Sequence, residues 1–139
     1  MMNEHRDLAL PEPRINADSR EFWEGARNKR LLLKICRSCA HAHYPPRHLC
    51  PKCWSNHTDW IESSGSATVY SFTIMRRAPS PEFNNRVPYV VALLDLPEGP
   101  RMMANIVGDD ALDVHIGDPV VLVFEDRQGI NVPQFQRKS

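Results

Sequence analysis

The residues best suited to chemistry are four cysteines arranged as two CxxC pairs. Cys36 and Cys39 form the first pair, Cys50 and Cys53 form the second, and ten residues lie between the pairs. Each pair can place two thiolates on one side of a tetrahedral metal ion, and ten residues suffice for a hairpin that brings the pairs together. Four thiolates close the coordination shell, so we expect a structural Zn²⁺ site without an open position for a substrate.

The cysteine pattern leaves other metal and redox sites open. A thioredoxin-like redox pair would need a single CxxC in a βαβ unit. A mononuclear iron site of rubredoxin type has the same tetrahedral thiolate geometry, so the sequence does not separate iron from zinc. A nearby histidine can replace a cysteine ligand, but with four thiolates in register we expect the histidines to be ordinary loop residues. These histidines are His41, His43, His48 and His57.

The segments around the cysteines predict a helix and a small metal-bound sheet. We expect residues 1–17 to be a mobile, polar leader. A helical segment should follow at 18–30, because Asp18 and Glu21 form a possible capping box at its start. Its apolar stripe consists of Phe22, Trp23 and Ala26. The zinc ribbon is expected at 31–64, and it includes a strand at 31–35 before the first knuckle and a strand at 59–62 after the second. This small sheet buries little core, so metal binding should supply most of its folding free energy.

Residues 65–139 predict an all-β barrel of the size of an OB-fold. Tyr70 and Phe72 alternate with polar neighbours on the first of its strands, and we expect both to lie on one strand face and to pack in the core. The segment 109–114 can form one helical turn. Five strands are expected, at 67–76, 87–96, 101–107, 120–125 and 132–135. The fold class is therefore mainly β: an N-terminal helix, a rubredoxin-like zinc ribbon and a C-terminal OB-fold barrel.

Composition and charge exclude several classes of protein. The 139 residues contain 17 basic and 17 acidic side chains, so no overall field draws the chain to nucleic acid. The longest apolar runs fall far short of the roughly 20 residues of a membrane span. The first residues are charged and show no secretory signal, which favours a cytoplasmic location.

Catalytic motifs are missing from the sequence. It has no GxSxG, no glycine-rich phosphate loop and no cysteine outside the two pairs. Asp113 and His115 lie two residues apart, but a pair without a third group is weak evidence for acid-base catalysis. We therefore assign no catalytic residue, and we expect the chain to have no activity on its own.

A local excess of positive charge surrounds the cysteines. Residues 20–52 contain eight basic and two acidic side chains. This patch can meet the phosphates of coenzyme A or an acidic surface of a partner, or it can be a solvated face that offsets the thiolate charge. We expect Phe22 and Trp54 to pack in the core, whereas Trp23 and Tyr44 either contact a partner or cover the ribbon. The candidate residues for binding a partner or CoA are Trp23, Arg27, Arg30, Lys34, Tyr44 and Arg47.

The sequence from about residue 18 to 135 resembles a known family. The residues that carry the resemblance are Leu32-Leu33-Lys34-Ile35-Cys36, Tyr44-Pro45-Pro46-Arg47, Cys50-Pro51-Lys52-Cys53, Trp60, Val69-Tyr70-Ser71-Phe72-Thr73, Pro88-Tyr89-Val90-Val91-Ala92, Leu96-Pro97-Glu98-Gly99-Pro100-Arg101 and Ile116-Gly117-Asp118-Pro119-Val120. They resemble the zinc-ribbon OB-fold acyl-CoA-associated family, long catalogued as a domain of unknown function. Members of that family have an N-terminal helix, a rubredoxin-like zinc ribbon and an OB-fold.

The resemblance implies a role in a larger assembly. Members of the family are typically small partner subunits of thiolase-superfamily enzymes, among them thiolases, acyltransferases and aldolases that act on CoA thioesters. Others are paired with hot-dog-fold enoyl-CoA hydratases. This sequence departs from the family at Ala40, where glycine is usual, at Ser66-Ala67, where a second glycine is usual after Gly65, and at Trp54.

Three functions follow as hypotheses. The first is a non-catalytic, zinc-binding accessory subunit of a thiolase-like enzyme acting on acyl-CoA thioesters, with a hot-dog-fold hydratase as an alternative partner. The second is a zinc-ribbon and OB-fold module that binds single-stranded nucleic acid, for which a salt-dependent shift of DNA or RNA would be required. The third is a stand-alone acyl-CoA carrier or sensor, which calorimetry with CoA and an acyl-CoA would detect.

Overall fold

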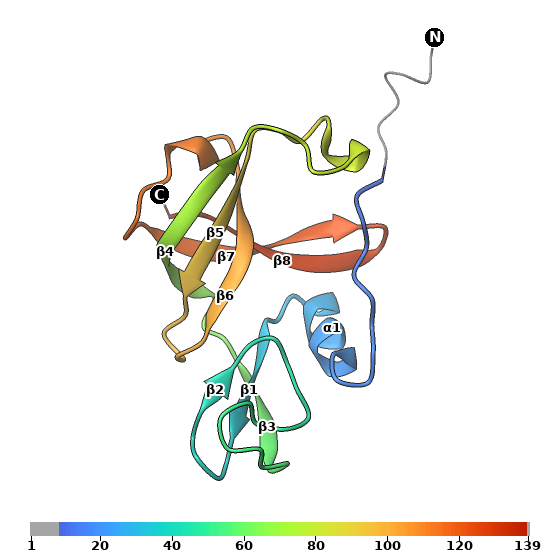
Figure 1. Cartoon of the computed structure of the whole chain (residues 1–139), viewed down its shortest axis with the longest axis vertical. Helices are drawn as coiled ribbons and strands as arrows, with labels where there is room; N and C mark the ends of the chain where they lie inside the picture. The colour runs from blue at the N-terminus through green and yellow to red at the C-terminus, as the bar shows by residue number, and fades with distance from the viewer. Residues whose placement is uncertain (1–8, 139) are drawn as a thin grey trace.

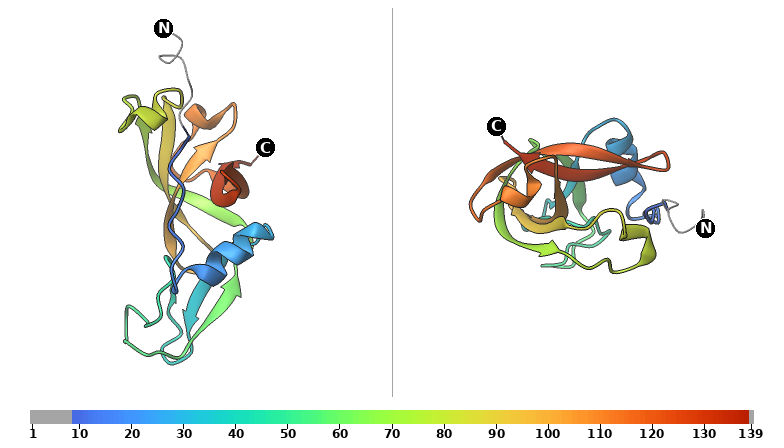
Figure 2. Two further views of the ribbon diagram at one scale, coloured as in Figure 1. Left: turned by 90° about the vertical axis from the view of Figure 1, so that its right-hand side faces the viewer. Right: turned by 90° about the horizontal axis from the view of Figure 1, so that it is seen from above.

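The described residues, 9–138 of a computed structural model, form a small sheet and a closed barrel joined by one helix. Figure 1 shows the barrel above, the small sheet below, and the helix α1 beside the junction of the two. Figure 2 shows that the sheet extends from one end of the barrel, which gives the chain an elongated shape. The predicted order of helix, ribbon and barrel is confirmed.

Helix α1 runs over Arg20–Arg27 and lies where the apolar stripe predicts it. Its N-cap is Ser19, and no side-chain cap hydrogen bond is made, so the expected capping box at residues 18 and 21 is wrong. The side chains of Asn16 and Ser19 instead accept hydrogen bonds from each other's backbone N–H, at 2.9 and 3.1 Å. This reciprocal pair fixes the turn one residue before the helix, so the helix start does not need the acidic residues.

The ribbon sheet consists of β1 (Leu32–Cys36), β2 (Ala42–His43) and β3 (Thr58–Glu62), in the order β2-β1-β3. Both predicted ribbon strands are found within one residue of their expected ends. The hairpin strand β2 was not predicted because two residues carry no periodicity. It pairs with β1 through Lys34 and His43, so His43 is a strand residue rather than a loop residue.

The barrel contains the five predicted strands. They are β4 (Ser66–Met75), β5 (Tyr89–Asp95), β6 (Arg101–Val107), β7 (Pro119–Arg127) and β8 (Ile130–Arg137). The barrel closes in the order β4-β5-β6-β8-β7, with β4 paired to β7 and a parallel pair between β6 and β8. Two short 3₁₀ turns, η2 (Pro81–Phe83) and η3 (Ala111–Asp113), lie in the connections. Antiparallel strands closed by one parallel pair are the arrangement of an OB-fold.

Tyr70 does not lie in the core, contrary to the prediction for β4. The pairing of β4 with β5 shifts register between Val69 and Ser71, and this irregularity changes which side chains face inward. Val69 is buried and Phe72 packs against the core, whereas Tyr70 is 49 % exposed. The Arg101 guanidinium covers the Tyr70 ring at 3.4 Å from its centroid, so this face is not open for stacking with a base.

One core runs through the helix, the ribbon and the barrel. Phe22 of α1 and Leu33 of β1 belong to the same buried cluster as Phe135 of β8. Helix α1 approaches β1 closely at Gly25, where an added Cβ would lie 2.7 Å from Leu32. Because the core is continuous, the ribbon and barrel are held as one unit rather than as two loosely linked domains.

The Phe22→Ala variant is expected to unfold more readily by about 3 to 5 kcal/mol, because a fully buried ring at this junction is replaced by a cavity. For a chain of this size the melting temperature should fall by about 10 °C. Thermal unfolding followed by circular dichroism measures this change. A fall of only a degree or two would show that the helix does not tie the ribbon to the barrel.

The described part of the expected leader is bonded to the barrel. Arg127 donates a hydrogen bond to the carbonyl of Pro11, and Gln128 donates one to the carbonyl of Leu10, both at 3.3 Å. Residues 1–8 of the expected leader lie outside the described residues. Within residues 9–138, no helix has the length and apolar character needed to cross a bilayer.

Candidate metal centre and docking surfaces

The four cysteine side chains converge at the tip of the ribbon. Their sulfur atoms all lie within 4.8 Å of one another. The Cys36 and Cys53 sulfurs are 3.6 Å apart, and the Cys39 and Cys50 sulfurs are 3.7 Å apart. Four sulfurs at about 2.3 Å from a Zn²⁺ ion form a tetrahedron with edges of about 3.8 Å. The sulfur positions therefore fit one tetrahedral zinc ion, and no histidine of residues 9–138 belongs to the group.

Backbone amides that donate to the sulfurs favour the thiolate form at Cys36 and Cys50. The Cys39 amide donates to the Cys36 sulfur at 3.5 Å, and the Lys52 amide donates to the Cys50 sulfur at 3.4 Å. The Cys39 amide is the main cause that lowers the pKa of Cys36 to about 6, although burial acts in the opposite direction. At Cys53 the Ser55 amide lowers the pKa, but burial and the neighbouring thiols outweigh it and raise the pKa to about 12. Zinc binding displaces the protons of these closely spaced thiols, so the affinity for zinc should fall at low pH.

Each CxxC pair ends in a residue with left-handed backbone conformation. Ala40 has φ 65° and Trp54 has φ 67°, and each amide donates to the carbonyl of the first cysteine of its pair. A positive φ favours glycine, so the backbone at Ala40 explains why glycine is usual at this place in the family. Trp54 is 75 % exposed, so the prediction that it packs in the core is wrong.

His43 is buried in strand β2 and is not one of the four metal-binding side chains. It is 5 % exposed, and burial is the main cause that lowers its pKa. Neither ring nitrogen has a hydrogen-bond partner among the described residues. Its ring stacks on that of His41, with centroids 6.2 Å apart. The lowered pKa keeps the buried His43 imidazole neutral.

The candidate basic residues do not form one open patch. Arg30 pairs with Glu62 at 2.9 Å, and Lys34 lies 4.4 Å from the centre of the Trp60 ring. Arg37 pairs with Asp59 at 2.7 Å, and this pair lowers the pKa of Asp59. Strand β3 thus supplies acidic partners that the count over residues 20–52 leaves out. Within residues 9–138, Arg27 and Arg47 remain exposed without an ion pair.

The two aromatic candidates open onto one groove between the helix and the barrel. The groove has a volume of about 300 Å³ and combines an apolar wall with a few polar groups. Trp23 and Tyr44 line it from the helix and the ribbon, while Met103, which is 64 % exposed, lines it from β6. Burial raises the pKa of Tyr44, so its hydroxyl stays protonated. The remaining walls of the groove come from Phe83, Tyr89, Val91, Ala104, Asn105, Arg127, Val132, Pro133 and Gln134.

Met103 was missed by the sequence analysis, although the alternation of β6 contains a signal. Met102 is buried at 2 % exposure and the next side chain must point outward. Leu93, its cross-strand neighbour on β5, is also exposed at 37 %. Met103 and Leu93 therefore form an apolar pair on the outer face of the barrel.

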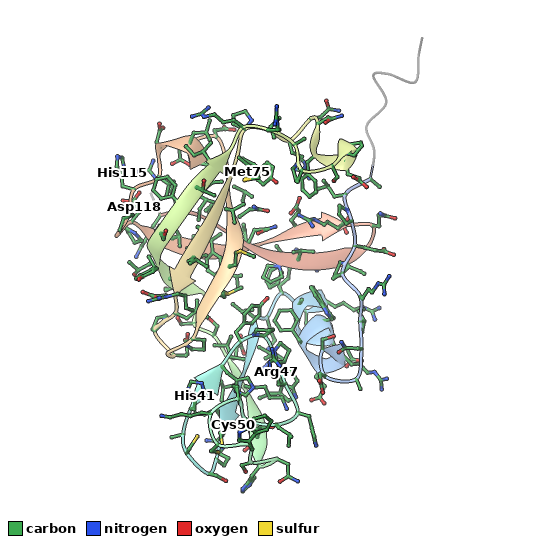
Figure 3. All side chains as sticks on the ribbon, in the orientation of Figure 1. His41, Arg47, Cys50, Met75, His115 and Asp118 are labelled. Atoms are coloured by element: carbon green, nitrogen blue, oxygen red, sulfur yellow. The ribbon has the colours of Figure 1, made fainter. Side chains whose placement is uncertain are left out.

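His115, which the sequence places near Asp113, lies on the exposed surface of the barrel. His115 is 78 % exposed on its side chain, and its Nδ1 lies 3.9 Å from a carboxylate oxygen of Asp118. Figure 3 shows both residues on the barrel, well away from Cys50 at the tip of the ribbon. An exposed histidine with one carboxylate and no cavity lacks the parts needed for acid-base catalysis.

A zinc-ribbon sheet followed by a five-stranded OB-fold barrel defines the class of this protein. Comparison with known families gives the same division. The ChsH2 rubredoxin-like zinc ribbon domain matches residues 23–58, and the ChsH2 C-terminal OB-fold domain matches residues 60–125. The chain belongs to this ChsH2 family of DUF35 proteins.

Relatives at 26 to 40 % identity are named as subunits or scaffolds. A probable enoyl-CoA hydratase alpha subunit of Thermomonospora curvata is 40 % identical over 86 % of this chain, but the match spans only 37 % of that protein. A DUF35 domain-containing scaffold protein of Methanocaldococcus jannaschii is 34 % identical over 73 % of each chain. The benzoylsuccinyl-CoA thiolase subunit BbsA of Thauera aromatica is 26 % identical over 68 % of this chain and 66 % of its own length.

The structure also resembles a solved complex component. A chain of the Ltp2-ChsH2(DUF35) aldolase superposes with a TM-score of 0.79 at 36 % identity, covering 91 % of this chain and 98 % of that one. A crystal structure of a DUF35 protein from Sulfolobus solfataricus, at 17 % identity and a TM-score of 0.65, shares the fold.

Proposed function

We propose that this chain is a non-catalytic accessory subunit that binds a thiolase-superfamily enzyme acting on CoA thioesters. The observation that carries the proposal is the groove between the helix and the barrel, where Trp23, Tyr44 and the exposed Met103 form an apolar surface. Aromatic side chains and methionine are enriched in the centres of protein interfaces. A thiolase subunit and an aldolase component among the similar proteins support an enzyme of this superfamily as the partner.

The metal in this proposal is one structural Zn²⁺ held by Cys36, Cys39, Cys50 and Cys53. Zinc would tie the two CxxC turns together and supply no chemistry to a substrate, because its four protein ligands close the shell. Free thiols of this kind persist in a reducing compartment such as the cytoplasm. The proposed parts are the helix at 18–30, the ribbon at 31–64 and the barrel at 65–139.

The partner enzyme would hold the reacting groups, and this chain would complete its surface. Arg27 and Arg47 are free to meet an acidic partner surface or the phosphates of a CoA thioester bound by the complex. Arg30 and Lys34, which have partners within the ribbon, would serve chiefly to order it. A hot-dog-fold enoyl-CoA hydratase is the second candidate partner, because a hydratase alpha subunit is 40 % identical to this chain.

Co-expression tests the proposal. The full chain, carrying an affinity tag, is produced with thiolase-superfamily proteins and hot-dog-fold hydratases encoded in the same genome, and the mass of each purified complex is measured. We expect a stable complex with a thiolase-superfamily protein. If the chain purifies only with a hydratase, the partner is a hydratase and not a thiolase-superfamily enzyme. If it binds no enzyme but binds single-stranded DNA in a salt-sensitive way, the accessory-subunit proposal is wrong.

A further inference from the structure

Strands β6 and β8 pair over a short stretch and then separate, which leaves part of β6 without a neighbour on that side. Among the described residues, their parallel pairing joins only 106–107 of β6 to 135–136 of β8. The β7–β8 hairpin then runs past β6 on the side of α1 (Figure 1), where the Asn131 side chain donates to a backbone carbonyl of the helix at 3.1 Å. Residues 103–105 and 132–134 line the groove described above, so the groove lies where the two strands separate.

The unpaired edge of β6 directs its peptide groups toward this opening. In an antiparallel pair, successive residues direct their N–H and C=O groups alternately toward the neighbouring strand and away from it. Leu96 donates to the carbonyl of Pro100 across the turn between β5 and β6, so the even-numbered residues of β6 bond to β5. The peptide groups of Arg101, Met103 and Asn105 therefore face away from β5.

The chain satisfies one of these three residues itself and leaves the other two open. The Asn105 amide donates to the side-chain oxygen of Gln134 at 2.6 Å, and the Gln134 side chain donates back to that of Asn105 at 3.1 Å. Gln134 is buried, so this pair closes the fork between the strands. Within residues 9–138, the backbone N–H and C=O groups of Arg101 and Met103 make no hydrogen bond on this side.

The facing edge of β8 is protected against strand pairing, whereas β6 is not. Lys138 donates to the carbonyl of Pro119, so the even-numbered residues of β8 bond to β7 and Pro133 faces the opening. Proline has no N–H to donate, and it is one of the residues that keep a sheet edge from pairing with another chain. The opening therefore has one receptive edge, at Met103.

An enzyme that covers Met103 must also satisfy its peptide groups. Burying an N–H and a C=O without partners is costly. A helix bonds its own peptide groups internally and would leave those of Met103 unpaired, whereas an extended segment pairs with them. Arg127 is the one charged residue that lines the groove, and it already pairs with Glu125 at 3.3 Å, so the opening favours uncharged side chains.

We propose that an extended, uncharged segment of the enzyme adds to β6 as a further strand at Met103. This inference rests on the proposed function and specifies how the enzyme binds. The segment would exchange backbone hydrogen bonds with Met103, and every second side chain would point into the groove toward Trp23 and Tyr44.

Amide hydrogen exchange of the full, zinc-loaded chain tests this mode of binding, measured by NMR for the chain alone and in its complex with the co-purified enzyme. The Met103 amide should exchange fast in the free chain and at least about a hundredfold more slowly in the complex. Met102 is the internal control, because its amide bonds to β5 and should be protected in both states.

A pair of variants tests the same hydrogen bond through the affinity. Met103→Pro removes the outward N–H without breaking a bond to β5, while Met103→Leu keeps that N–H and an apolar side chain. We expect Met103→Pro to bind the enzyme about thirtyfold more weakly than Met103→Leu. A protected Met102 amide and one zinc ion per chain show that each variant is folded.

The possible results separate this inference from the proposed function. If the complex forms but the Met103 amide exchanges as fast as in the free chain, or if the two variants bind equally well, strand addition is wrong and the accessory-subunit function stands. If no enzyme binds the chain, both are wrong. A Met103 amide that is already protected in the free chain, together with a dimer in ultracentrifugation, would assign this edge to a second copy of the chain.

Discussion

The Cys36→Ser variant is expected to lose its zinc ion and the ordered structure of the ribbon tip. Cys36 is fully buried, and its sulfur forms one edge of the sulfur tetrahedron with that of Cys53 at 3.6 Å. Structural zinc contributes about 10 to 16 kcal/mol in comparable small sites. The tip has few apolar residues to replace this contribution, because the shared core lies at the other end of the ribbon around Phe22 and Leu33.

Two measurements follow this variant. The zinc content measured by elemental analysis should fall from one ion per chain to none. Amide hydrogen exchange should become fast over residues 36–58, while the barrel amides stay protected. Ser38→Ala is the control, since it changes the same turn and leaves the four sulfurs in place. A Cys36→Ser chain with a fully protected ribbon and no metal would show that zinc is not needed for the fold.

The Met103→Glu variant is expected to weaken binding of the partner enzyme by about a hundredfold or more. Met103 is 64 % exposed on β6 and lines the groove with Trp23 and Tyr44. A carboxylate placed in the apolar centre of an interface is buried there without a partner, and central contacts carry most of the binding energy. The fold should be unaffected because the side chain already faces solvent.

Ile116→Glu is the matched control for this variant. Ile116 is 70 % exposed and follows His115, which Figure 3 shows on the barrel far from the ribbon. Ile116→Glu should leave the affinity for the partner enzyme unchanged, whereas Trp23→Ala should reduce that affinity as Met103→Glu does. Affinity is measured by calorimetry on the co-purified enzyme. Equal binding by Met103→Glu and the unaltered chain would remove this groove from the interface.

The features that depend on short spacing could be predicted from the sequence. Two CxxC pairs ten residues apart define the ribbon because the metal-binding turns are local. The strand expected at 101–107 is found at those residues as β6, directly after the Pro- and Gly-containing segment 97–100. These patterns involve neighbours in the chain, for which simple rules hold.

The features that depend on distant contacts could not be predicted. Tyr70 continues the exposed face of Thr68, and the register shift after Val69 brings Phe72 to the core side instead; no residue type marks this shift. The groove exists only in the folded chain, because Trp23 and Met103, which line it, lie about 80 residues apart in the sequence. Asp59 and Glu62 of β3 pair with Arg37 and Arg30, so part of the positive charge expected around the cysteines is neutralised.

Turnover of a CoA thioester tests the central claim most directly, measured for the purified chain, for the thiolase-superfamily enzyme alone, and for the co-expressed pair. The accessory-subunit account predicts no turnover by the chain, full turnover by the pair, and low activity or solubility of the enzyme alone. Turnover by the isolated chain, or an enzyme equally active and soluble without it, would contradict the account.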